Sequence, residues 1–282
     1  MVKLIECPRD AMQGLHEFIP TNMKADYLNL LLQVGFDTLD FGSFVSAKAI
    51  PQLRDTTAVL EKLDLSKSKT KLLAIIANIR GAEEAIVHPE ISYLGYPLSV
   101  SETFQKRNTN SDIQQSLISV EKLINLCEKA NKEPVIYLSM GFGNPYGDPW
   151  SPEIVENSVC KLAELGAGVL SLADTSGVSD PEKIRHLYTH LVSRFPNIEF
   201  GVHLHSTPAT TYEKIEAAWE SGCRRFDSAL RGFGGCPMAE DKLTGNIATE
   251  SLISFLTEQK EKLNLNMERW NEAIAYSGKI FG

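Results

Sequence analysis

The sequence predicts an α/β fold, a closed (β/α)8 TIM barrel with a short C-terminal helical extension. Eight short apolar runs alternate with amphipathic helical segments along the 282 residues, and this alternation is typical of parallel strands joined by right-handed helical crossovers. Eight such units at this length favour a closed barrel over an open sheet. The open alternative calls for a GxGxxG turn after its first strand, whereas this chain has Pro8-Arg9-Asp10-Ala11-Met12-Gln13-Gly14 there.

The expected strands are short apolar runs bounded by turn residues. They begin near Val2, Phe36, Lys71, Ile91, Pro134, Val169, Ile198 and Cys223. We expect the chain, residues 1–282, to form one catalytic domain.

Several helix boundaries can be placed between these strands. Thr21 is expected to cap a helix that ends before Gly35. Ser151-Pro152 and Asp180-Pro181 each put a capping side chain before a proline, a residue favoured at the first helical position. Residues 251–262 and 267–277 are expected to supply the last barrel helix and the C-terminal extension.

Composition excludes several classes of protein. The net charge of −8 argues against a surface that tracks nucleic-acid phosphates. The sequence has neither an apolar run of the roughly 20 residues that span a bilayer nor an N-terminal secretory pattern. The five cysteines are dispersed and lack CxxC spacing, which indicates a reducing environment. We expect a cytoplasmic protein that binds neither nucleic acid nor membrane.

Polar residues gather at the expected carboxyl ends of the strands, where barrels of this class build their active sites. They are Asp10, Asp40, Asn78, Ser139, Asp174, His203, His205 and Asp227. Burying each of them without a partner would cost roughly 1–3 kcal/mol. A shared metal ion and substrate would satisfy many of them together.

The segment Val202-His203-Leu204-His205 is the most specific of these signals. Side chains alternate along a strand, so His203 and His205 project from the same face. Together with Asp10 and Asn246 they form a mixed oxygen and nitrogen set, which suits Mg²⁺ or Mn²⁺ and leaves Zn²⁺ possible. Taken alone, the histidine pair is also typical of a hydrogen-bonded core, and Asp10 of a turn after proline.

Six motifs in chain order resemble those of the hydroxymethylglutaryl-CoA lyase family, which lies within the DRE-TIM metallolyase group. They are Pro8-Arg9-Asp10, Ser43-Phe44-Val45-Ser46, Asp174-Thr175-x-Gly177-Val178, Val202-His203-x-His205, Gly232-x-Gly234-Gly235-Cys236-Pro237 and Gly245-Asn246-x-Ala248-Thr249-Glu250. The resemblance covers nearly the whole chain. The glycine-rich cysteine loop is the mark most specific to the lyases.

The resemblance implies a divalent-metal-dependent carbon–carbon lyase that cleaves 3-hydroxy-3-methylglutaryl-CoA to acetoacetate and acetyl-CoA. The implied cofactor is Mg²⁺ or Mn²⁺, the substrate is a CoA thioester, and the implied assembly is a homodimer. The implied metal ligands are Asp10, His203, His205 and Asn246. The family has glutamate at the position of Asp40, so the reach of this shorter carboxylate becomes a question for the structure.

The resemblance also implies roles for residues around the metal. Arg9 is expected to face the thioester oxygen and stabilise the enolate that forms there. Cys236 is expected on a mobile loop over the substrate, where its thiol can protonate the enolate carbon. Asp40, Asp174 and His203 are candidate bases for the substrate hydroxyl, and the sequence does not rank them.

The phosphates of CoA call for cations. Lys48 is our candidate contact, and Arg80, Lys106 and Arg107 occupy comparable expected loops, although solvated surface charge also accounts for all four.

Three alternatives stay open at this point. One is a related lyase that acts on a longer-branched 3-hydroxyglutaryl-CoA. Another is a DRE-TIM condensing enzyme, which the lack of a large C-terminal regulatory domain argues against. The third is a non-catalytic barrel, with Asp40 as a mark of lost activity.

Overall fold

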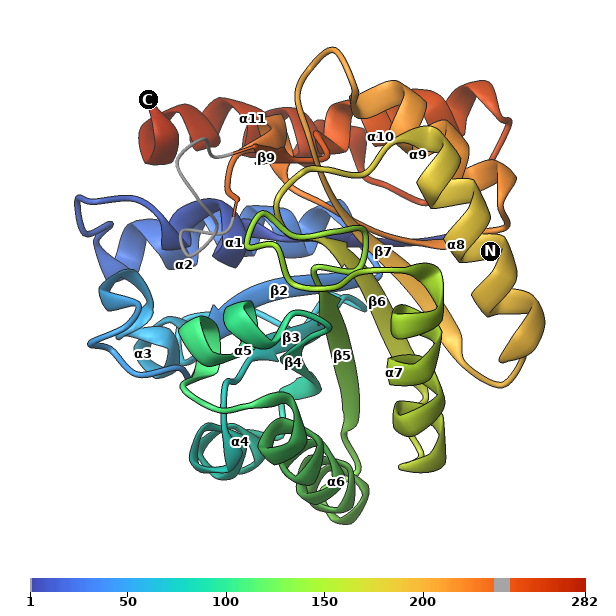
Figure 1. Cartoon of the computed structure of the whole chain (residues 1–282). Coiled ribbons are helices and arrows are strands. Elements are labelled where there is room, and N and C mark those ends of the chain that lie inside the picture. Colours follow the sequence, from blue (N-terminus) through green and yellow to red (C-terminus); the bar gives the residue numbers. More distant parts are fainter. Residues whose placement is uncertain (1, 236–243) are drawn as a thin grey trace.

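Eight parallel strands close into a barrel in the computed structural model of the chain, which describes residues 2–235 and 244–282 (Figure 1). Each strand pairs with its neighbours in chain order, β1 pairs with β8, and the β6–β7 pairing completes the ring. The strands are β1 (Lys3–Glu6), β2 (Thr38–Ser43), β3 (Lys71–Ile75), β4 (Ile91–Ser99), β5 (Glu133–Ser139), β6 (Val169–Asp174), β7 (Glu199–Ser206) and β8 (Arg225–Ser228). The predicted TIM barrel is confirmed, and every expected strand start falls within two residues of the observed one.

A short ninth strand, β9 (Gly245–Asn246), pairs antiparallel with β7 and was not predicted. It places Asn246 directly opposite His205.

Helices surround the barrel and cover its outer face (Figure 1). They are α1 (Pro8–Gln13), α2 (Thr21–Val34), α3 (Thr56–Leu60), α4 (Ile79–Ile86), α5 (Glu102–Thr109), α6 (Ile113–Lys129), α7 (Pro152–Glu164), α8 (Pro181–Arg194), α9 (Thr211–Glu220), α10 (Thr249–Glu258) and α11 (Met267–Phe281), with 3-10 turns η1 (Pro51–Leu53) and η2 (Leu230–Gly232). None of the helices within the described ranges is both long and apolar enough to cross a membrane.

The helix caps test the sequence predictions individually. The side chains of Ser151 and Asp180 accept hydrogen bonds from the first turns of α7 and α8, as predicted. Gly35 ends α2 in the left-handed conformation, with φ of 92°. The expected cap at Thr21 is wrong: Pro20 holds the capping position, and the Thr21 hydroxyl donates to Asp55 at 2.8 Å.

Two further expectations about local structure are corrected. The segment after β1 is a helix, α1, in which Pro8 takes the first position, rather than a turn. β3 ends at Ile75, and Asn78 caps α4, accepting from Gly81 N at 3.0 Å, so it is not a strand-end residue. The C-terminal helices are confirmed as elements, with α10 ending at Glu258 and α11 reaching Phe281.

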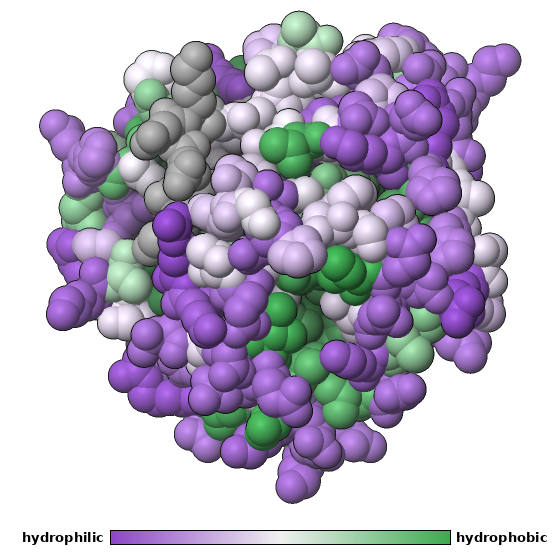
Figure 2. All heavy atoms as spheres, in the orientation of Figure 1, coloured by the Kyte–Doolittle hydropathy of each residue, from purple (hydrophilic) through white to green (hydrophobic). Residues whose placement is uncertain are grey.

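Apolar side chains fill the space between the strands and the helices, and a smaller apolar cluster occupies the barrel interior. The interior cluster consists of Leu73, Tyr93, Val135, Tyr137 and Val169. Much of the outer surface is hydrophilic, with hydrophobic residues coming to the surface near the middle of the face drawn in Figure 2. Because the interior is filled, access to the strand ends comes from the mouth of the barrel.

Candidate active site

A pocket opens at the carboxyl ends of the strands, on the side where α1 follows β1. Arg9, Asp10, His203 and His205 line its polar side. Apolar side chains form much of the rest of its wall, among them Val45, Ile50, Ile75, Pro97 and Phe104. The pocket therefore places a charged cluster against an apolar surface, as in sites that bind small organic molecules.

Asp10, His203 and His205 form the centre of this pocket. One ligand atom from each lies within 4.8 Å of the other two, and all three residues are buried. His205 directs Nδ1 to the carbonyl oxygen of Thr175 at 3.1 Å, while its Nε2 is buried and has no hydrogen-bond partner in the described part of the chain. A neutral imidazole that donates from Nδ1 presents a lone pair at Nε2. The buried nitrogen without a partner is what a divalent cation in this space would satisfy.

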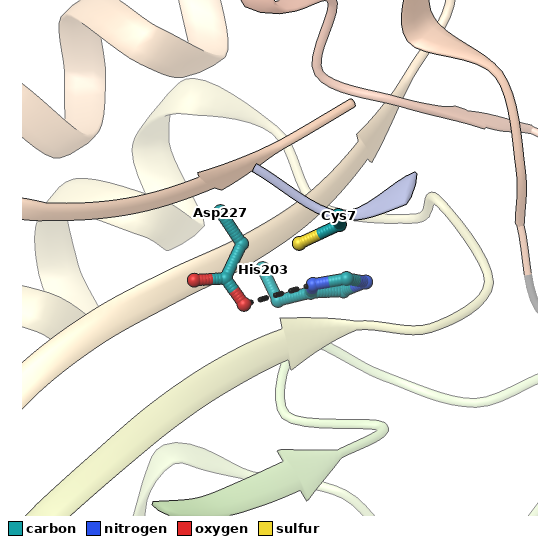
Figure 3. Close-up of side chains that lie close together, drawn as sticks. All are labelled: Cys7, His203 and Asp227. Atoms are coloured by element: carbon teal, nitrogen blue, oxygen red, sulfur yellow. Dashed lines mark hydrogen bonds and ion pairs between the residues drawn. The ribbon is translucent and has the colours of Figure 1, made fainter. Parts of the chain in front are cut away.

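His203 is oriented in the same way by a residue on the neighbouring strand. Its Nδ1 lies 3.1 Å from Asp227 Oδ2, and Figure 3 shows this interaction with Cys7 beside it. The β7–β8 register places the two residues opposite each other. Cys7, His203 and Asp227 also lie close enough to hold a metal. Burial raises the pKa of the Cys7 thiol, and Asp227 already engages His203 Nδ1, so the Asp10 grouping is the better metal site.

Asp10 is held by donors on both of its carboxylate oxygens. Oδ1 accepts from Arg9 at 3.0 Å and from Gln13 at 2.7 Å. Oδ2 accepts from Asn246 Nδ2 at 2.6 Å and from Gly235 N at 3.4 Å. The β7–β9 pairing thus brings Asn246 to the predicted metal set, and its bond to Asp10 leaves the amide oxygen as the atom that can act as a ligand.

The pKa values of these groups follow from burial and mutual charge. Burial opposes ionisation of Asp10, but the charges of Arg9 and the histidines hold its pKa well below the usual range. Burial and then the charge of His203 lower the pKa of His205 to about 4. For His203, burial acts to lower the pKa, but the hydrogen bond and charge of Asp227, followed by the charge of Asp10, raise it above the ordinary value. An ionised Asp10 and a neutral His205 near pH 7 are the protonation states that metal binding requires.

Arg9 is fixed by carboxylates along two edges of its guanidinium. Nε donates to Asp40 Oδ2 at 2.9 Å and Nη2 donates to the same oxygen. Nη1 donates to Asp10 and to Gln13 at 3.0 Å each. Burial raises the pKa of Asp40 to about 6 although Arg9 acts to lower it. The shorter carboxylate of Asp40 therefore reaches Arg9, and it supports the guanidinium from behind the pocket.

Asp174 lies at the end of β6, but the structure places it outside the lining of this pocket. Its carboxylate accepts from the Ser179 hydroxyl and, at 2.9 Å, from Lys214 Nζ. Lys214 also donates to the His205 carbonyl at 2.8 Å. Through these two bonds Lys214 of α9 joins Asp174 at the end of β6 to β7 behind the histidines, and sequence reasoning did not assign Asp174 this supporting role.

The candidate contacts for CoA are exposed, but the expected loop position is wrong for three of them: Arg80 lies on α4, and Lys106 and Arg107 lie on α5. Lys48 is exposed on the loop after β2, next to Ala49, which lines the pocket. Arg80 pairs with Glu84 at 3.6 Å and Lys106 with Glu102 at 3.1 Å, while the Arg107 guanidinium stacks over the Tyr146 ring. Cys236 lies outside the described residues.

Sequence reasoning missed the residues that orient the predicted ligands. Asp227 was noted as a strand-end residue, and its place opposite His203 follows once β7 and β8 are known to be neighbours. Gln13 and Lys214 had no distinguishing signal, because one lies on an unpredicted helix and the other on the buried face of α9.

The geometry agrees with the comparison of this chain with known proteins. Residues 2–275 match the HMGL-like family. The chain belongs to this family. A hydroxymethylglutaryl-CoA lyase of Bacillus subtilis is 34% identical over 275 residues, which cover 98% of this chain and 91% of the relative. The resemblance to hydroxymethylglutaryl-CoA lyases is thereby confirmed.

Solved structures of HMGL-like lyases share the whole fold. The HMG-CoA lyase of Bacillus subtilis superimposes with a TM-score of 0.92 at 32% identity, covering 99% of this chain and 93% of the other. An HMG-CoA lyase of Acinetobacter baumannii, in complex with coenzyme A and 3-methylmalate, gives 0.91 at 29% identity, covering 99% and 91%. The likeness therefore extends over the barrel and the C-terminal helix.

Proposed function

We propose that this HMGL-like protein is a divalent-metal-dependent lyase that cleaves 3-hydroxy-3-methylglutaryl-CoA to acetoacetate and acetyl-CoA. The single observation that carries the proposal is the buried group of Asp10, His203 and His205, with the Nε2 of His205 lacking a partner among residues 2–235 and 244–282. Asp10, His203, His205 and Asn246 would hold the metal. Bound there, Mg²⁺ or Mn²⁺ would make the substrate hydroxyl more acidic and orient it.

Arg9 supplies the second part of the chemistry. Breaking the C2–C3 bond delivers an electron pair to the acetyl-thioester, where it forms an enolate. The Arg9 guanidinium lines the pocket and is held in place by Asp10 and Asp40. Because it is always charged and already oriented, it can stabilise the enolate oxygen without reorganising during the reaction.

The proton transfers need a base and an acid. Of the three candidate bases, His203 lines the pocket, whereas Asp40 and Asp174 lie behind it. The Nε2 of His203 serves as ligand or as base, but not both at once. We retain Cys236 as the proton donor to the enolate carbon and Lys48 as a contact for CoA.

The apolar wall of the pocket favours a second candidate substrate. Val45, Ile50, Ile75 and Phe104 present aliphatic and aromatic surface near the polar cluster. A longer-branched 3-hydroxyglutaryl-CoA would bury more apolar area against these side chains.

The homodimer and the cytoplasmic location stay predictions.

The decisive experiment measures acetyl-CoA release from hydroxymethylglutaryl-CoA. We expect turnover that EDTA abolishes and that added Mg²⁺ or Mn²⁺ restores. Parallel assays with longer-branched acyl-CoA substrates separate the two lyase candidates. The variant His203→Ala should lose metal affinity, measured by calorimetry. Absence of turnover at saturating metal, together with unchanged metal affinity in His203→Ala, would indicate a non-catalytic barrel.

A further inference from the structure

A layer of polar side chains lies inside the barrel, one level below His203. The strand register aligns Tyr137 with Ser171 and Ser171 with Gly201. On β8, Arg225 neighbours the level of Gly201, since Val202 pairs with Phe226. Side chains two apart share a face, so Arg225 points to the same side as Asp227.

Five polar atoms in this layer and at its upper edge are buried and have no hydrogen-bond partner within the described ranges. They are Tyr137 Oη, Ser171 Oγ, Arg225 Nε, Arg225 Nη2 and Asp227 Oδ1. Buried polar atoms in folded proteins nearly always have partners, either in the chain or in bound water. A concentration of unsatisfied atoms on neighbouring strands therefore points to a ligand that the layer holds.

The guanidinium of Arg225 is built into this layer. The side chain is almost fully buried, and its Nη1 lies 3.4 Å from Glu199 Oε1. A Cβ at Gly201 would lie 2.9 Å from both Cγ and Cδ of Arg225. The glycine thus makes room for the arginine stem to cross β7. The unsatisfied Nε and Nη2 form the side-on edge of the guanidinium, which offers two parallel donors.

The lining identifies the ligand as water rather than an anion. Arg225 contributes donors, but Asp227 Oδ1 is an acceptor that would repel an anion. Water accepts from the guanidinium edge and donates to the carboxylate, and the two hydroxyls can do either. Buried water in proteins occupies polar sites with two to four such partners.

We propose that water enclosed in this layer bridges Arg225 to Asp227, so that Arg225 acts as a positioning residue for the imidazole of His203. Asp227 Oδ2 is bonded to His203 Nδ1, and its Oδ1 is the atom free to receive the bridge. Fixing both carboxylate oxygens fixes the plane of the carboxylate and hence the direction of the His203 ring. The effect on metal affinity rests on the proposed function, whereas the effect on the ring does not.

The test uses two variants of the full chain, Arg225→Met and Ser171→Val. The first removes the donor edge, and the second fills the water space without changing charge. We expect nitrogen NMR of the histidine side chains, recorded at a pH where the His203 ring is neutral, to show a mixture of His203 tautomers in both variants, in place of a single Nδ1–H form. The affinity for Mn²⁺, measured by calorimetry, should fall roughly tenfold, in line with the loss of other outer-sphere partners of metal-bound histidines.

Tyr93→Phe is the matched control. The centre of the Tyr93 ring lies 5.6 Å from the Arg225 guanidinium carbon, a contact that phenylalanine keeps, and the hydroxyl that the variant removes accepts from Lys71 Nζ at 3.2 Å. This variant should keep the His203 tautomer and the Mn²⁺ affinity of the parent protein.

Three results would overturn the inference. A high-resolution crystal structure could show no water in the layer, or an anion in place of water, or the His203 resonances could be unchanged in folded Ser171→Val. If Arg225→Met does not fold, the result for Ser171→Val still tests the bridge. A changed tautomer in a protein without lyase turnover would support the bridge while contradicting the proposed function.

Discussion

The placement of Arg9 depends on neighbours of opposite charge. One edge of the guanidinium meets Asp40 and another meets Asp10, and both carboxylates are buried. A buried ion pair is costly to assemble, and removing one partner is costlier because it strands the other charge. The Asp40 carboxylate is one methylene shorter than the glutamate that the resemblance implies at this position, yet its oxygen lies 2.9 Å from Arg9 Nε. The shorter side chain therefore still gives the support that Arg9 needs.

Asp40→Asn tests this support at a single residue. The amide keeps the shape but removes the charge, so Arg9 is held less firmly and kcat should fall about 10- to 100-fold, the value of one hydrogen bond to a charged group. Mn²⁺ affinity should change little, because Asp40 lies outside the candidate ligand group. Asp26→Asn, at an exposed helical position, is the control. A parental kcat in Asp40→Asn would contradict the proposed role.

The alternation of side chains along a strand predicts well which way each side chain points. It predicts poorly which residues of other elements contact that side chain. The common orientation of His203 and His205 follows from a period of two and is confirmed by their shared pocket. The contact of Lys214 with Asp174 could not be predicted, because it depends on how α9 packs across the end of β6. Helical periodicity marks the buried face of α9, but it does not say which strand residue that face will meet.

At the scale of elements, β9 and the glycine-rich segment before it place Asn246. Gly245 and Asn246 pair with the end of β7, where Asn246 lies opposite His205. The chain approaches so closely here that a Cβ at Gly245 would lie 2.2 Å from the Gly232 carbonyl oxygen. At Gly234, a Cβ would lie 2.5 Å from Asn246 Nδ2 and 2.9 Å from Asp10 Oδ2. Glycine is therefore required at both positions, because a Cβ there would clash with atoms at or next to the candidate metal ligands.

Gly234→Ala should weaken Mn²⁺ binding by about tenfold or more, since it displaces Asn246 and Asp10 together. Its φ of +104° adds backbone strain. Gly147→Ala is the matched control, because Gly147 has a φ of +75° but no neighbouring atom within 4 Å of the added Cβ. The control should lose some thermal stability while keeping its metal affinity. Equal metal affinities in the two variants would exclude Gly234 from shaping the site.

Helices and strands that are long enough to repeat their hydrophobic pattern several times were predicted. The shortest elements were not. The barrel strands were placed within two residues because each is an apolar run between turn residues. α1 has six residues and β9 has two, too few to establish a period of 3.6 or 2. Both carry candidate ligands, so the sequence identified Asp10 and Asn246 through their motifs rather than through their local structure.

On the scale of the whole molecule, Glu6 links the beginning of the barrel to its end. Its carboxylate accepts from Leu230 N at 2.8 Å and from the Thr249 hydroxyl at 2.6 Å, residues more than 220 positions away. The side chain is fully buried. Burial raises its pKa to about 8, although these hydrogen bonds act to lower it. Closure of the barrel thus depends on a carboxyl group that is protonated in the folded protein near pH 7.

Glu6 should therefore make the folded protein less stable as the pH rises. Between its unfolded pKa of about 4.5 and its folded pKa of about 8, the folded state binds a proton that the unfolded state has lost. The free energy of unfolding should fall by about 1.4 kcal/mol per pH unit across this window and level off above it. Glu6→Gln cannot titrate and should lack this slope, whereas Glu61→Gln, at an exposed position, should retain it. Urea unfolding of the three proteins from pH 5 to pH 8 measures the difference, and parallel curves for parent and Glu6→Gln would show that the Glu6 carboxyl is ionised inside the barrel.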